Sequence, residues 1–271
     1  MTVIANWGDE KTAKSTFAIS APKPIFHCDF DLGIERAYGI KLVEQNVNGK
    51  VIKVDLDMEV ESTPYAMPFQ LGGKINGVKE LWNTFLADYV KVLENQKLYQ
   101  DKTPFRSIIL DTGTQEYEVC RFGYLQEKQE VQLARGLRPG EDLRESLLSV
   151  EYAEPYARLK TLIYGARSYK KNLMITHYST DEYAQRLGKD GRQEDYKTGK
   201  LRLDGFKYTE GLADLVLYNY RKEVIIDKIP VTQLWGLITL SGLDIRMEGM
   251  TFQNPSYDSI IKALKMYRGE E

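Results

Sequence analysis

The sequence predicts an α/β protein built on a mainly parallel, twisted β-sheet that is flanked by helices. Short apolar runs, each long enough for one buried strand, alternate along the chain with segments whose apolar residues have helical spacing. Turn-forming or acidic residues follow several of these runs, as expected where a strand passes into a loop. Strands that alternate with helices are joined by crossover connections, so neighbouring strands are expected to run parallel.

The periodicity places each element in turn. Strands are expected at residues 2–7, 24–30, 51–56, 105–110, 172–178, 215–220 and 234–240. Helices are expected at residues 14–21, 78–93, 115–131, 152–169 and 255–267. Residues 135–144 carry glycine and proline and predict a loop, and the polar segment 179–211 has room for a hairpin.

Composition and length are those of a globular protein. The chain has 271 residues, a formal net charge of −2 and 42% hydrophobic residues, without an internal repeat or a convincing linker. We expect one domain over residues 1–271, in which residues 230–271 form a C-terminal antiparallel extension. No apolar run approaches the ~18 residues of a membrane span, and no secretory signal is recognisable. The near-neutral charge gives no global electrostatic footprint for nucleic acid.

Cysteine and histidine usage argues against zinc and for a reducing compartment. Cys28 and Cys120 are the two cysteines, and the two histidines are scattered, without the spacing of a zinc site. Free thiols fit a cytoplasmic protein.

The first expected strand and helix flank a phosphate-binding motif. Residues 8–16 read GDEKTAKST, which matches the P-loop pattern GxxxxGK[S/T] at every defined position except Ala13. Backbone N–H groups and the helix N-terminus of such a loop face phosphates. The predicted nucleotide site therefore comprises Gly8, Asp9, Glu10, Lys11, Thr12, Ala13, Lys14, Ser15 and Thr16.

Three residues of this loop have distinct expected roles. Lys14 supplies charge to the outer phosphates, and we expect its side chain to face solvent when the site is empty. The Ser15 hydroxyl can ligate Mg²⁺. Ala13 occupies a position where a positive φ costs more for alanine than for glycine. The alternative is a lysine-bearing turn that only resembles the motif, but the strand before it and the helix after it favour phosphate binding.

Acidic residues at strand ends supply further candidates. Asp111 ends the run FRSIILD and is predicted to hold Mg²⁺, the alternative being an Asp that caps a turn. Asp31 follows the second strand and is predicted to orient a water on the γ-phosphate, with Asp29 and Glu35 as rivals and a plain turn carboxylate as the alternative.

The strand NLMITHY ends in Thr176 and His177. A polar residue at that end can sense the γ-phosphate and move the loop that follows, so His177 is a candidate sensor. A structural role for this histidine is the alternative.

These motifs, in this order, resemble those of the RecA-like ATPases of phages, the Sak-type single-strand DNA recombination ATPases and their phage nucleotide-binding relatives. The matching pieces span about residues 3–220 and are GDEKTAKST, FHCDFDLGIERA, FRSIILDTGTQEYE, NLMITHY and RLDGFKYTEGLADLVLY. The resemblance implies a RecA-like P-loop core, ATP and Mg²⁺ as cofactors, ATPase activity in single-stranded DNA recombination or replication, and the host cytoplasm as location. The acid after the second strand is usually Glu in RecA-like proteins, and Asp31 is the best match. Ala13 departs from the usual Gly, which bears on hydrolysis more than on binding.

The resemblance also implies partners. It predicts a homo-oligomeric ring or filament with nucleotide between subunits. Because no arginine is evident near the phosphate site of one chain, Arg202, beside Lys200, is the candidate finger acting on a neighbour's nucleotide. The alternative is that both are solvated charges on a hairpin.

Two segments are candidates for binding single-stranded DNA, namely residues 128–145 and 179–200. Tyr183 and Tyr196 in the second segment can stack on bases. Each segment carries equal numbers of basic and acidic residues, which argues for weak or assembly-dependent binding. A phage single-strand-binding or annealing protein is a further expected partner. A nucleotide-binding assembly or regulatory protein, with slow turnover and no direct DNA role, is the alternative function.

Overall fold

The computed structural model describes residues 1–37, 39–47, 49–55, 57, 59–70, 73–95, 104–137, 140–187 and 192–270. Its strands are β1 (Val3–Gly8), β2 (Ile25–Asp29), β3 (Val43–Val47), β4 (Lys50–Asp55), β5 (Val60–Pro64), β6 (Ser107–Asp111), β7 (Asn172–Leu187), β8 (Gln193–Leu203), β9 (Leu215–Ile226), β10 (Ile229–Ser241) and β11 (Thr251–Gln253). Its α-helices are α1 (Lys14–Ala18), α2 (Val78–Leu93), α3 (Gly113–Ala134), α4 (Ala153–Ser168), α5 (Thr209–Leu212) and α6 (Tyr257–Arg268). Short 3₁₀ turns are η1 (Ile34–Arg36), η2 (Ser149–Tyr152) and η3 (Ile245–Met247).

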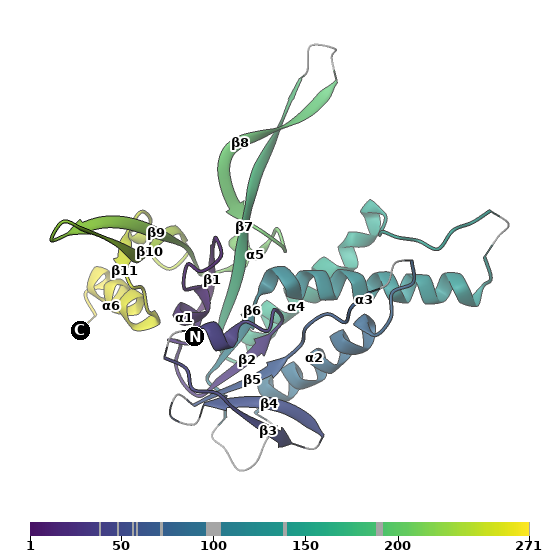
Figure 1. Ribbon diagram of the computed structural model, residues 1–271, viewed down its shortest axis with the longest axis horizontal. Coiled ribbons are helices and arrows are strands. Elements are labelled where there is room, and N and C mark those ends of the chain that lie inside the picture. The colour runs from purple at the N-terminus through teal and green to yellow at the C-terminus, as the bar shows by residue number, and fades with distance from the viewer. Residues whose placement is uncertain are drawn as a thin grey trace.

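The strands form one twisted sheet in the order β11-β10-β9-β1-β7-β6-β2-β5-β4-β3, with β8 paired to β7 outside this path (Figure 1). The central strands from β9 to β5 are mutually parallel. Strands β3 and β4 extend one side of the sheet antiparallel, and β10 and β11 extend the other. The predicted α/β class with a mainly parallel sheet and a C-terminal antiparallel extension is confirmed.

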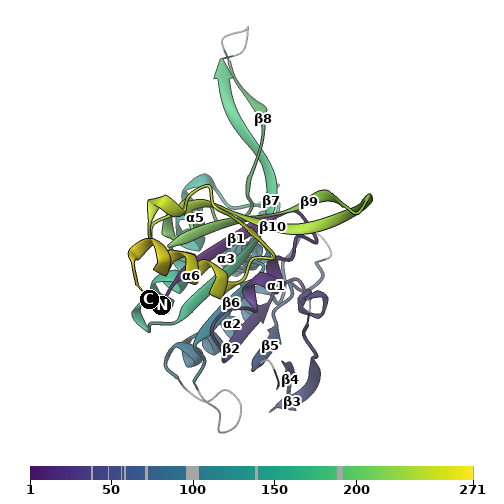
Figure 2. The same cartoon turned by 90° about the vertical axis from the view of Figure 1, so that its left-hand side faces the viewer.

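Helices cover both faces of the sheet. Successive side chains of a strand point to opposite faces, and in the buried strands both sets are apolar. Ile108 and Leu110 of β6 pack against the side formed by α2, α3 and α4. Ile109 lies between them and packs on the opposite side, together with residues of α1 and α6. Figure 2 shows the two helical layers at right angles to the first view. Among the described residues, no helix combines the length and apolar character needed to cross a membrane.

Two antiparallel ribbons leave the sheet. Strand β7 continues past its predicted end at residue 178 to Leu187 and pairs with β8, and we call this ribbon the arm. Strands β9 and β10 also extend beyond their predicted ends and pair with each other as a second ribbon, the hairpin. Both project from the body of the molecule (Figures 1 and 2). The expected end of the third strand at Leu56 lies outside the described residues.

Candidate functional site

A cavity of about 350 Å³ opens over the P-loop at the carboxyl ends of the parallel strands, where α/β sheets bind ligands. The loops after β1 and β2, the end of β6 and a residue of β7 all contribute to it. Its lining comprises Glu10, Lys11, Thr12, Ala13, Lys14, Ser15, Thr16, Asp31, Gly33, Arg36, Ala37, Asp111, Thr112, Tyr178, Arg221 and Leu234.

The P-loop leaves β1 at Gly8 and enters α1 at Lys14. Gly8 has φ 154°, and a Cβ atom there would lie 2.1 Å from the carbonyl oxygen of Asn219, so only glycine fits this close approach. The buried Asn6 amide donates to the Lys14 carbonyl (3.0 Å) and ties the start of α1 to β1. The strand, loop and helix expected around the motif are therefore present.

Ala13 lies in the left-handed region, with φ 63° and ψ 30°, as the missing motif glycine predicts. Ala13→Gly is expected to raise the free energy of unfolding by about 1 kcal/mol, because alanine is strained in this region and glycine is not. Denaturant unfolding measures the gain, and nucleotide titration is expected to show affinity at least equal to wild type. Ala18→Gly, the same change in the right-handed part of α1, is the control and is expected to destabilise. A loss of stability in Ala13→Gly would contradict the strain.

Lys14 corrects one expectation. Its side chain does not face solvent: the residue is 7% exposed, and Nζ donates to the carbonyls of Gly8 (2.9 Å) and Asp9 (2.6 Å). The ammonium also lies 5.0 Å from the centre of the Tyr178 ring. Burial lowers the pKa of Lys14, and the nearby Asp111 opposes that shift. The hydrogen bonds to these two loop carbonyls keep the Lys14 ammonium inside the loop and away from solvent.

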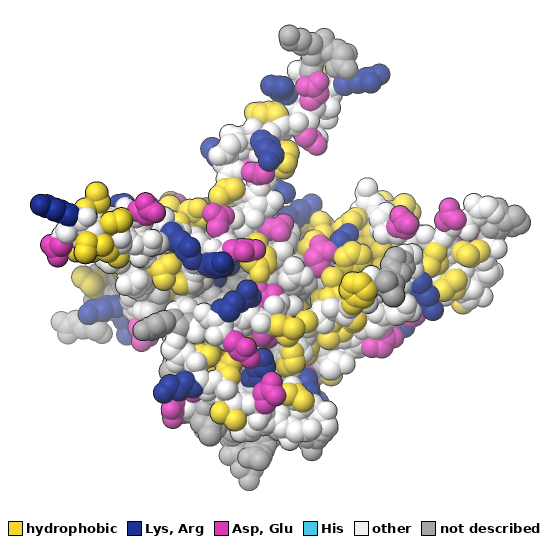
Figure 3. All heavy atoms as spheres, viewed as in Figure 1, with side chains coloured by type: hydrophobic (Ala, Val, Ile, Leu, Met, Phe, Trp, Pro, Cys, Tyr) yellow, Lys and Arg dark blue, Asp and Glu magenta, His cyan; other side chains and the backbone are white. Residues whose placement is uncertain are grey.

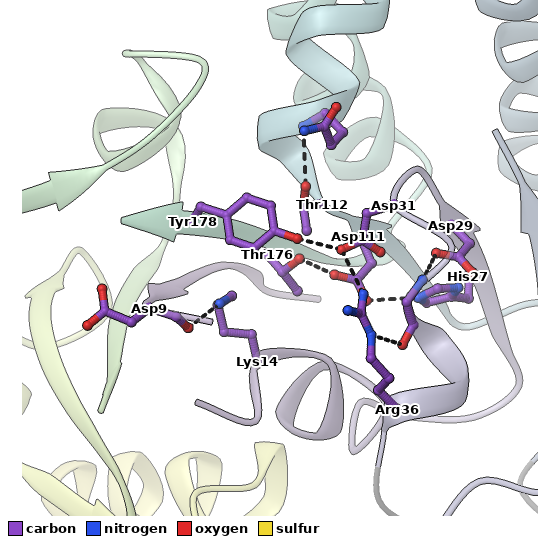
Figure 4. A network of polar contacts seen from close by, with 12 residues as sticks. Asp9, Lys14, His27, Asp29, Asp31, Arg36, Asp111, Thr112, Thr176 and Tyr178 are labelled. Atoms are coloured by element: carbon purple, nitrogen blue, oxygen red, sulfur yellow. Dashed lines mark hydrogen bonds and ion pairs between the residues drawn. The ribbon is translucent and has the colours of Figure 1, made fainter. Parts of the chain in front are cut away.

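Asp111 lines the cavity, and Thr176 and His27 lie against its carboxylate (Figure 4). The Thr176 hydroxyl donates to Oδ1, and Nε2 of His27 lies 3.3 Å from Oδ2. Ser15 of the P-loop lines the same cavity and helps to lower the pKa of this carboxyl. Although burial disfavours the charged form, these hydrogen bonds hold the pKa of Asp111 below its usual value. Ser15 and Asp111, both predicted as metal ligands, are thus brought together.

Asp31 faces the cavity. The Tyr178 hydroxyl donates to its Oδ2 (2.7 Å), and an Arg36 nitrogen lies 3.4 Å from the same oxygen. Its Oδ1 is buried and has no hydrogen-bond partner among the described residues, so this oxygen keeps unused capacity to accept a hydrogen bond.

The two rivals of Asp31 have other partners. Asp29 is buried at the end of β2 and accepts the Gly33 amide (3.0 Å), and burial raises the pKa of its carboxyl. Glu35 has a side chain that is 63% exposed and pairs with Lys53 at 2.5 Å. Asp31 lines the cavity, and neither Asp29 nor Glu35 does.

His177 points to the other face of the sheet, because side chains alternate along β7 and its neighbour Thr176 points to Asp111. The buried His177 ring donates from Nδ1 to the Asp204 carbonyl (2.8 Å) at the base of the arm. Its Nε2 has no partner among the described residues and lines a second cavity, of about 10 Å³, with Glu116. His177 therefore does not line the cavity over the P-loop, whereas its neighbour Thr176 faces Asp111, which lines that cavity.

Glu116 and His177 are expected to make stability depend on pH in opposite directions. Burial raises the pKa of Glu116 to about 8 and lowers that of His177 to about 4. Folded Glu116 keeps its proton up to about pH 8, whereas an unfolded glutamate loses it near 4.3, so its contribution falls as pH rises through this window. The contribution of His177 rises between pH 4 and 6.5 and is then constant.

Between pH 6.5 and 8 the contribution of His177 is constant and only that of Glu116 changes. The free energy of unfolding is therefore expected to fall by about 2 kcal/mol over this range. Urea unfolding across this range measures the slope. Glu116→Gln is expected to flatten it. Glu118→Gln is the control on the same helix, since that carboxylate pairs with Arg121. An equal slope in Glu116→Gln and wild type would contradict the assignment.

Two arginines lie near the site, contrary to the expectation from the sequence. The sequence suggested no arginine close to the phosphates of its own chain, but Arg36 of η1 and Arg221 of β9 both line the cavity. Arg36 follows the second strand in sequence, and Arg221 comes from the hairpin. Arg202 and Lys200, the expected finger residues, are exposed on β8, where Arg202 pairs in register with Thr180. They do not line the cavity of their own chain.

The predicted DNA-binding segments are described in part. Arg138 of residues 128–145 and Lys189 of residues 179–200 lie outside the described residues. Four of the described cations pair with acidic residues: Arg135 with Glu141, Arg144 with Glu151, Lys197 with Asp181, and Arg186 with Glu194. The face drawn in Figure 3 likewise shows basic and acidic side chains interspersed.

Sequence reasoning missed His27, Tyr178, Arg36 and Arg221. The run PIFHCDF carried one signal, since a histidine in the middle of a buried strand needs polar partners. Its Nδ1 lies 2.9 Å from the Ser62 hydroxyl of β5, and its Nε2 faces Asp111. The His27 ring of β2 thereby links Ser62 of β5 to Asp111 of β6.

No protein-family model and no curated protein matches the chain. Among solved structures, it is similar to the KaiC-like protein PH0186 from the hyperthermophilic archaeon Pyrococcus horikoshii OT3, with a TM-score of 0.44 and 11% sequence identity. The likeness spans 93% of this chain and 84% of the other. The geometry of the P-loop, and not this likeness, supports the function proposed below.

Proposed function

We propose that the chain is a single RecA-like nucleotide-binding domain that binds ATP with Mg²⁺ and hydrolyses it. The observation that carries the proposal is the meeting of the P-loop with Asp111: Lys14, Ser15 and the buried Asp111 line the same cavity. Hydroxyl and carboxylate oxygens suit Mg²⁺, so Ser15 and Asp111 would hold the ion, which neutralises phosphate charge when bound. The Lys14 ammonium and the loop N–H groups would bind the outer phosphates.

Hydrolysis needs a group that orients water, and Asp31 is the residue that we infer for it. Tyr178 and Arg36 hold Oδ2, while Oδ1 has no partner among the described residues. A water that enters the cavity and donates to Oδ1 would be oriented with its lone pair toward the γ-phosphorus, and the proton that it loses on attack would pass to this carboxylate. The bond to the leaving β–γ bridging oxygen then breaks, releasing ADP and phosphate.

The finer part of the proposal is a phage-type role in single-stranded DNA recombination or replication. It is supported by the arm, where Tyr183 and Tyr196 are 52% and 39% exposed and each lies beside a cation, Lys197 and Arg186 respectively. Exposed rings beside cations suit base stacking. We propose assembly into a ring or filament, and a phage single-strand-binding or annealing protein as partner, on the resemblance alone.

The alternative is a nucleotide-binding assembly or regulatory protein with slow turnover. The strained Ala13 and the paired cations of the two candidate DNA segments favour it. ATP hydrolysis measured with and without single-stranded DNA, beside native mass, separates the two functions. Stimulation by DNA supports the recombination role, and slow DNA-independent hydrolysis supports the alternative. Absence of Mg²⁺-dependent ATP binding would remove both.

A further inference from the structure

The geometry points to Arg221 as a phosphate-binding arginine that acts on the nucleotide of its own chain, an inference that rests on the ATP site proposed above. The Arg221 guanidinium donates from Nε and Nη2 to the Lys11 carbonyl of the P-loop, at 2.9 and 2.5 Å. It lines the cavity together with Leu234, its register partner on β10. The hairpin therefore forms one wall of the proposed ATP site.

The strand that carries Arg221 is fixed against the P-loop. Strand β9 pairs with β1 up to Trp7 and Tyr218, whose rings lie 4.4 Å apart. One residue farther, the Asn219 carbonyl oxygen is in close approach to Gly8. Side chains alternate along a strand, so Arg221 projects on the same face as Asn219. The positioning of Arg221 is thus set by the β1–β9 pairing and not by a flexible loop.

The chemistry of this wall suits the phosphates of a nucleoside triphosphate. Arg221 presents two donors of its planar fork to a single neutral carbonyl, whereas phosphate oxygens accept such a fork with full charge assistance. Charge-assisted hydrogen bonds are about twice as strong as neutral ones, so an entering phosphate competes well with the Lys11 carbonyl. Arg221 transfers no proton; it stabilises charge on the outer phosphate oxygens.

The test compares ATP with ADP in the presence of Mg²⁺. Arg221→Ala is expected to weaken ATP affinity roughly 10–100-fold, with a smaller loss for ADP, and to lower kcat. Arg221→Lys is expected to recover part of the loss, since it restores charge without the fork. Lys222→Ala is the matched control, because that neighbouring cation lies over the Trp235 ring, 5.5 Å from its centre, and does not line the cavity.

Mixing variants decides whether Arg221 acts within its chain. At an ATP concentration near the wild-type Kd, Arg221→Ala and Lys14→Met are each expected to hydrolyse ATP much more slowly than wild type. Their mixture is expected to be no faster than the sum of the two, since neither chain then has both groups. Recovery on mixing would place Arg221 in a neighbour's site and overturn the inference. Equal ATP-to-ADP affinity ratios in Arg221→Ala and wild type would overturn it as well. If wild type binds neither nucleotide, the proposed function fails first, which is a different result.

Discussion

Replacing Asp31 with asparagine is expected to slow ATP hydrolysis roughly 10²–10⁴-fold while leaving ATP affinity within about threefold. Asparagine keeps the shape of the side chain and can still accept the hydrogen bond that Tyr178 donates to Oδ2. It loses the negative charge of the buried Oδ1, which has no other partner among the described residues. Single-turnover hydrolysis, measured beside equilibrium ATP binding, separates the chemical step from affinity.

Four companion variants sharpen this result. Tyr178→Phe removes the hydrogen bond that orients Asp31, so it is expected to slow hydrolysis less than Asp31→Asn does. Asp111→Asn is expected instead to lower Mg²⁺-dependent affinity, because it removes charge beside the proposed ion. If Asp31→Asn hydrolyses ATP normally and Asp29→Asn or Glu35→Gln does not, the water-orienting role moves to that residue.

Lys14→Met is expected to weaken ATP affinity by roughly 100-fold, as befits the loss of charge-assisted hydrogen bonds to phosphate. Methionine keeps the aliphatic length of the buried side chain, which alanine would not. Because the ammonium also bonds the Gly8 and Asp9 carbonyls, the variant is expected to lose some stability too. Isothermal titration with ATP, at a temperature well below the unfolding midpoint, measures the affinity of the folded variant.

Lys262→Ala on the exposed side of α6 is the lysine control, expected to bind ATP as wild type does. Circular dichroism of both variants checks that each is folded. Folded Lys14→Met with wild-type ATP affinity would show that the motif is only a lysine-bearing turn.

Much of the sheet was predictable because burial imposes its own pattern on the sequence. The helix expected at residues 78–93 is observed as α2 over the same residues, since its apolar stripe is long and regular. Strand β7 was predicted only to residue 178, because its buried part ends there and the rest is stabilised by pairing with β8. Strand β5, which reads VESTP, was missed because polar side chains fill buried positions there.

In the candidate site, too, the residues placed by local sequence were predictable and those placed by long-range pairing were not. The P-loop and Asp111 are contiguous in sequence with the elements that position them, so pattern alone located them. Arg221 reaches the cavity through a strand pairing between residues more than 200 positions apart, and no local pattern records it. The burial of Lys14 was missed because the carbonyls that hold it, those of Gly8 and Asp9, come from the folded path of the loop, which no residue pattern records.

Strand β7 passes from the interior of the sheet into the arm without interruption (Figures 1 and 2). At its base, Tyr178 bonds Asp31 and the Ser179 hydroxyl bonds Asp9, so the strand is held by the same residues that surround the phosphate site. Residues 179–187 at ~3.3 Å each project ~30 Å, so a tilt of ~10° at the base displaces the tip by ~5 Å. In mechanical terms, a rotation of β7 at the cavity would be amplified along the arm, because the far end of the arm lies much farther from the cavity than Tyr178 does.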